Sequence, residues 1–262
     1  MTRMIHAELL RLVRRRTLTV VAAAAVLFSV VATLTVFSSA QDVGVPSRRA
    51  GTTLAALSGH GGGTEAFAVG ASFVGFFVFV TFIALIATEF SGGTFRALLL
   101  RDPHRLRLIV GKLIGALTVA AGALVVAELL SFGLSLAMAP TKDIDTGAWF
   151  SMAGLGHAFG NLGTAFAGVV GWAVFGTTLA VIFRSAPIAL AVGFAWAGPF
   201  ENIVVDSWTT GYRVFPGQVL AAIIQGGTPE ISLQRAVLTG AVYVGIAAAA
   251  ATTLLTRRDV TS

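Results

Sequence analysis

The sequence has 262 residues, of which 56% are hydrophobic and only 11% are charged, and its mean hydropathy is +0.86. A soluble domain carries about 25% charged residues, so this composition excludes an ordinary soluble protein and predicts an integral membrane protein. The chain has no cysteine, which excludes disulfides, thiolate metal sites and a cysteine nucleophile. The formal net charge is +6, but in a membrane protein the placement of basic residues carries more information than their sum.

Residues 1–16 precede the first long apolar run. Leu9 and Leu12 fall on one helical face, and arginines that include Arg11 lie on the other. This pattern favours a helix in the headgroup layer, with its arginines toward phosphate, over a plain basic tail.

Six apolar segments follow, and they predict an all-α integral membrane protein that forms a single domain over residues 1–262. Crossing a hydrocarbon core of roughly 30 Å takes about 20 residues, and the fifth segment, with about 14, is short for a full crossing. The expected spans are about 17–37, 66–88, 108–138, 158–183, 187–200 and 236–255.

Two external connections have distinct compositions. Residues 41–65 are rich in Gly, Ser and Thr, which predicts a flexible linker with His60 solvated at its tip. Residues 201–234 return to a more polar composition than the spans but contain an apolar piece, Val219 to Ile224. We expect a partly re-entrant external hairpin there, and irregular backbone at membrane depth needs protein or water around it.

The basic residues fix the expected orientation. With the N-terminus inside, the inner segments hold 13 of the 18 Lys and Arg residues and the outer segments hold five. Six spans with both termini in the cytoplasm therefore satisfy the positive-inside rule.

Motifs for catalysis or nucleotide binding are missing from the sequence. Gly111-Lys112 lacks the upstream glycine of a phosphate-binding loop and is followed by Leu113, so we expect no ATP hydrolysis by this chain. The four histidines are scattered, which argues against a zinc protease. We expect no catalytic residue, metal or cofactor on the chain itself.

Two features inside the spans are candidates for a translocation path. Glu128 is the one acidic residue deep in a span, and such a residue is functional by default. The alternative is a structural acid that is either protonated or hydrogen-bonded, with Asn161 as a candidate partner. Phe73, Phe76 and Phe77 share a face of the second span. They either line a path for an apolar cargo or serve packing and lipid contact.

The segment of residues 89–112, between the second and third spans, concentrates charge. Gly92-Gly93 breaks the helix after Glu89, because glycine adopts backbone angles that other residues avoid. A short helix should begin at Thr94, and Asp102-Pro103 should start the third span as N-cap and first helical residue. The apolar face of the short helix can bury in a partner, with Arg96 on another side; this face holds Phe95, Leu98 and Leu99. The basic residues that follow lie where headgroups or an acidic partner could meet them, and they are Arg105, Arg107 and Lys112.

This arrangement resembles the permease subunits of type-two ATP-binding-cassette exporters, over the whole chain. It combines the interfacial N-terminal helix, six spans, a short fifth span, an external hairpin and a loose motif after span two. The motif positions are Glu89, Gly93, Arg96, Pro103, Arg105, Gly111 and Lys112.

The resemblance implies that the 89–112 segment is a cytoplasmic coupling helix that contacts a separate soluble ATPase, present in two copies that carry ATP and Mg²⁺. It also implies a second permease chain, identical or related, a bacterial inner membrane, no nucleic acid, and outward transport of an amphipathic or lipophilic compound such as a drug, antibiotic or lipid. The expected coupling residues are Glu89, Gly93, Phe95, Arg96, Leu98, Leu99, Asp102, Arg105 and Lys112. A membrane-embedded enzyme and a regulatory membrane anchor remain the alternatives.

Overall fold

The computed structural model describes residues 8–40, 52–100 and 104–257, without the side chains of Arg96 and Ala97. Within these ranges every regular element is a helix, and six helices are long and apolar enough to cross a membrane. The expected all-α fold with six spans is therefore confirmed, and the chain is a multi-pass membrane protein.

The six spans lie close to the expected ones. They are formed by α2 (Arg15–Ser39), α4 (Gly62–Ser91), α6 (Arg105–Met138), α7 (Met152–Phe183), a fifth span that begins with α8 (Ala186–Ala195), and α12 (Leu233–Arg257). Residues 8–12, before α2, are also helical. The short helix α5 (Thr94–Leu99) connects α4 to α6.

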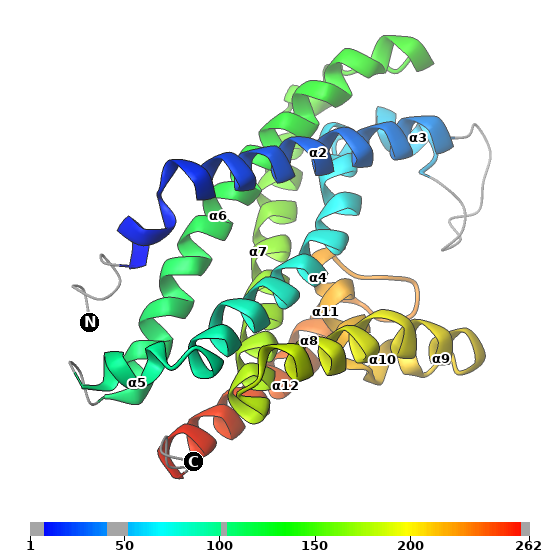
Figure 1. Cartoon of the computed structure of the whole chain (residues 1–262). Helices are drawn as coiled ribbons and strands as arrows, with labels where there is room; N and C mark the ends of the chain where they lie inside the picture. The colour runs from blue at the N-terminus through cyan, green and yellow to red at the C-terminus, as the bar shows by residue number, and fades with distance from the viewer. Residues whose placement is uncertain (1–7, 41–51, 101–103, 258–262) are drawn as a thin grey trace.

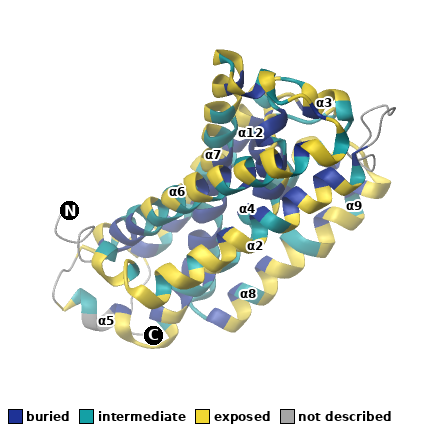
Figure 2. Cartoon of the chain, turned by 90° about the horizontal axis from the view of Figure 1, so that it is seen from above, coloured by how far each residue is buried: buried dark blue, intermediate teal, exposed yellow. Residues whose placement is uncertain are grey.

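Helices α4 and α7 pack against each other and form the centre of the bundle, with α2 and α6 on one side and α8, α11 and α12 on the other (Figure 1). Helix α5 and the end of α12 lie at one end of the bundle, whereas α3 (Leu54–Ser58) and α9 (Glu201–Ser207) lie at the other. Figure 2 shows many exposed residues along α2 and α8. Many of these residues are apolar, as expected where lipid replaces water.

The fifth span is longer than the sequence predicts. Helix α8 continues through a π-helical turn, Trp196–Phe200, into α9, and together they span 22 residues. At about 1.5 Å per residue this is roughly 33 Å, enough for a full crossing. The prediction of a short span was wrong because Glu201 marked its end, although this carboxylate is fully buried and accepts hydrogen bonds from the backbone of another helix.

After the fifth span the chain folds back onto the bundle through α10 (Gly211–Val214) and α11 (Pro216–Ile224). Helix α11 packs against α7 and α12, and most of its apolar residues are buried. Gly168 and Gly171 of α7 make this packing possible, because a Cβ on either glycine would overlap Ile224 or Leu220 of α11.

Part of the expected flexible linker is ordered. Residues 54–58 form α3, and Gly62 already belongs to α4. The indole of Trp149 donates a 2.8 Å hydrogen bond to the Leu57 carbonyl, which fastens α3 to the connection between α6 and α7. His60 is exposed, but its Nδ1 lies 2.8 Å from the Ser151 hydroxyl, so it is not merely solvated. Residues 41–51 lie outside the described part of the chain.

Candidate functional site

The 89–112 segment folds as a break, a short helix and a new span. Helix α4 ends at Ser91, and Gly93 adopts a positive φ of 70°, the conformation for which the glycine was expected. The Thr94 hydroxyl donates a 3.3 Å hydrogen bond to the Glu89 carbonyl and joins the start of α5 to the end of α4. Asp102 and Pro103 lie outside the described residues, so their part in starting α6 stays a prediction.

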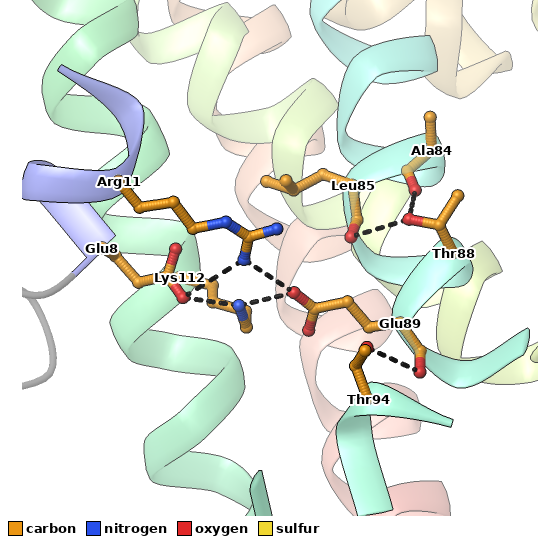
Figure 3. A network of polar contacts seen from close by, with 8 residues as sticks. All are labelled: Glu8, Arg11, Ala84, Leu85, Thr88, Glu89, Thr94 and Lys112. Atoms are coloured by element: carbon orange, nitrogen blue, oxygen red, sulfur yellow. Dashed lines mark hydrogen bonds and ion pairs between the residues drawn. The ribbon is translucent and has the colours of Figure 1, made fainter. Parts of the chain in front are cut away.

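A network of four charged side chains joins three segments near α5 (Figure 3). The Lys112 ammonium of α6 lies 2.6 Å from Glu89 Oε1 of α4 and 2.5 Å from Glu8 Oε1 of the N-terminal helical turn. Arg11 of the same turn adds a guanidinium 3.2 Å from Glu89 Oε1. We call Glu8, Arg11, Glu89 and Lys112 the lysine network.

Burial and charge balance set the strength of this network. The side chains of Lys112 and Glu89 are 1% and 7% exposed, so an unpaired charge at either position would cost several kcal/mol. Two carboxylates face one ammonium and one guanidinium, which leaves no net charge in the group. Arg11 is 53% exposed and therefore contributes about 0–1 kcal/mol.

The network corrects two expectations and adds one residue. Glu89 and Lys112 were expected to face a partner or the headgroups, but they are buried against each other, as Figure 3 shows. Arg11 was expected to point toward phosphate, and it pairs with Glu89 instead. Sequence reasoning missed Glu8; its signal was an acidic residue one turn before Arg11 in an otherwise basic segment.

The apolar side of α5 is covered by the chain itself. Phe95 is 2% exposed, stacks obliquely on Phe90 with ring centroids 4.5 Å apart, and packs with Leu108 of α6, Val181 of α7 and Leu255 of α12. The expectation that Phe95 projects into a partner is therefore wrong. Its burial belongs to the fold of this chain.

The remaining residues of the segment divide between the bundle and the surface. Leu98 and Leu99 are half-buried against the same apolar cluster as Phe95, and the Arg105 guanidinium donates a 3.1 Å hydrogen bond to the Leu255 carbonyl of α12. Leu100, by contrast, is 90% exposed. The side chain of Arg96 lies outside the described part of the structure.

Glu128 and Asn161 do not meet. Asn161 of α7 donates a 3.0 Å hydrogen bond to the Thr64 hydroxyl of α4. Glu128 is 8% exposed, and its Oε1 has no hydrogen-bond partner among the described residues. The expected contact between Glu128 and Asn161 is thus wrong, whereas a structural role for Glu128 and a role in transport both stay predictions.

The three phenylalanines expected on one face of the second span line two different cavities. Phe73 and Phe76 line a cavity of about 870 Å³ together with Asn161, whereas Phe77 lines a smaller apolar cavity of about 280 Å³ that also involves α2 and α6. A role for the three phenylalanines in a translocation path stays a prediction.

No protein-family model matches the sequence, and no curated protein matches it significantly. Among the described residues, no group of three or more His, Cys, Asp or Glu side chains is placed to hold a metal ion. What the geometry does present is a short helix, α5, that lies beside the lysine network and is held at one end of the bundle by the packing of Phe95 and by the Thr94–Glu89 hydrogen bond.

Replacing Lys112 with Met should destabilise the protein by about 3–5 kcal/mol, because two largely buried carboxylates would then face only the half-exposed Arg11. Arg11→Ala is the matched control and should cost at most about 1 kcal/mol. Unfolding of the purified protein in detergent micelles measures both effects. Equal losses for the two variants would show that the buried ammonium does not hold the three segments together.

Proposed function

We propose that this chain is the membrane-spanning subunit of an ATP-driven exporter of the type-two ATP-binding-cassette kind. The observation that carries the proposal is the placement of α5. This six-residue helix lies between two spans at one end of the bundle and is fastened to the bundle from two sides. A soluble motor that pushes on α5 would therefore move the spans rather than bend a loop.

The contacts of α5 explain how such a push would spread. Phe95 packs against side chains of α6, α7 and α12, and close-packed interiors transmit displacement because they have little free volume. The backbone between α5 and α4 is only Gly92-Gly93, and Thr94 bonds back to Glu89. Glu89 in turn pairs with Lys112 of α6, so α4 and α6 are linked beside α5.

The complete transporter needs parts beyond this chain. ATP and Mg²⁺ would bind two copies of a separate ATPase, since the sequence has no phosphate-binding loop. A second permease chain, identical or related, would complete the pathway, with α5 and both termini in the cytoplasm of a bacterial cell and α10 and α11 re-entering the membrane from outside. The cargo would be an amphipathic or lipophilic compound that leaves the cell.

Leu100→Glu should weaken co-purification of the ATPase from the native host by about tenfold or more. Burying a large apolar side chain in an interface is worth about 1.5–3 kcal/mol. Leu100 directly follows α5 and is exposed, so it is available for such burial by the ATPase. Because Leu100 is 90% exposed, the substitution should leave the melting temperature of the isolated chain unchanged.

Phe95→Ala is the contrasting variant. It should lower the stability of the isolated chain by about 3–5 kcal/mol, because it empties a buried site. Undiminished recovery of the ATPase with Leu100→Glu would contradict the proposal that the ATPase docks at α5. If no ATPase accompanies the unaltered chain, even after chemical cross-linking in membranes, the proposed function is wrong.

Single cysteines test the orientation, and the chain has none of its own to interfere. Ser58 and Ser91 flank the two ends of α4, and both are exposed. In intact cells a membrane-impermeant thiol reagent should label Ser58→Cys and leave Ser91→Cys unlabelled until the membrane is opened. The reverse labelling pattern would place α5 outside, where no cytoplasmic ATPase can reach it.

A further inference from the structure

The cavity of about 870 Å³ lies away from α5. It is bordered by the first half of α4, by α7, by the fifth span and by α10 and α11. Its size falls within the roughly 300–1,000 Å³ that is usual for sites binding small molecules. Glu65, at the opposite end of α4 from Glu89, belongs to its wall.

The wall combines aromatic rings with negative charge. Phe73, Phe76 and Trp172 supply aromatic surface, while Glu65 and Asp206 supply carboxylates. None of the described residues that line the cavity is a lysine or an arginine. Aromatic faces attract cations through the ring quadrupole, so rings and carboxylates favour the same sign of ligand charge.

The N-terminus of α11, which borders the cavity, is not available to an anion. A helix N-terminus attracts negative charge because its first N–H groups are free. At α11 these groups are taken by Glu201, whose carboxylate accepts hydrogen bonds of 3.2 and 3.1 Å from the backbone N–H groups of Gly217 and Gln218. An internal acid therefore occupies the position that a phosphate or carboxylate ligand would need.

The helix geometry beside the cavity indicates a formed site and not loose packing. The ring of Trp172 is only 6% exposed and is held against Gly75 of α4, where a Cβ would lie 2.7 Å from the ring. The π-helical turn of the fifth span borders the cavity through Ala197 and Gly198, and such turns are frequent at functional sites.

We propose that this cavity binds an organic cation with an aromatic or otherwise apolar body. The rings contact the body, and the carboxylates of Glu65 and Asp206 attract the charge. Glu65 also interacts with the Thr52 hydroxyl and the His157 ring. Asp206 is exposed, so its carboxylate is the more accessible of the two to a ligand. Identification of this ligand as the exported cargo rests on the proposed function, whereas binding itself does not.

Equilibrium dialysis of the full chain in phosphatidylcholine nanodiscs, with empty nanodiscs subtracted, tests the proposal. The probes are tetraphenylphosphonium and tetraphenylborate, which share shape and apolar surface and differ in the sign of charge. We expect saturable binding of the cation, at least about tenfold tighter than any binding of the anion. Asp206→Asn and Glu65→Gln should each raise the Kd of the cation about fivefold, as expected for the loss of one nearby carboxylate.

Asp145→Asn is the matched control, because it removes one negative charge in the connection between α6 and α7, at a residue that does not line the cavity. It should leave the Kd of the cation unchanged. Equal binding of the two probes, no saturable binding, or an equal effect of Asp145→Asn and Asp206→Asn would overturn the proposal. No ATPase is present in this assay, so loss of cation binding and absence of an ATPase partner are separate results.

Discussion

The structure depends on the burial of one ammonium group. Lys112 is 1% exposed, and a buried charge is tolerated only while its partners stay in contact. Those partners are Glu8 and Glu89, which lie 104 and 23 positions earlier in the chain, so a single side chain holds the N-terminal helical turn, α4 and α6 at one point. Gly115 of α6 favours the contact, because a Cβ there would lie only 3.1 Å from Glu8 Cβ. In our account this point supports α5 and thereby the proposed coupling to an ATPase.

The other end of the bundle uses a buried charge in a different way. Glu201 is fully buried and caps α11, which ties the fifth span to α11. The same carboxylate neutralises the helix end that borders the large cavity. In our proposals, the charges at one end join helices that a motor would move, and the charge at the other end shapes a cavity that favours cations.

Much of the fold was predictable from the sequence, because lipid requires long apolar helices and charge-poor runs reveal them. The length of the fifth span was underestimated, because an acidic residue in a sequence is taken as solvent-exposed unless its backbone hydrogen-bond partners are known. The lysine network was missed for a related reason: Glu8, Glu89 and Lys112 are far apart in the chain, and hydropathy does not predict pairing. For α5, helical periodicity identified an apolar face with Phe95 on it. Periodicity does not tell whether a partner or the chain itself covers that face, and the bundle covers it.

The central claim is that the lysine network makes the N-terminal turn and α5 parts of one rigid unit. Spin labels at Leu10 and Leu100, which are 64% and 90% exposed, report on it through the distance measured by pulsed electron resonance. The account predicts one narrow distance distribution in the otherwise unaltered chain and in Arg11→Ala, and a broad distribution in Lys112→Met. Equally narrow distributions in all three proteins would contradict it.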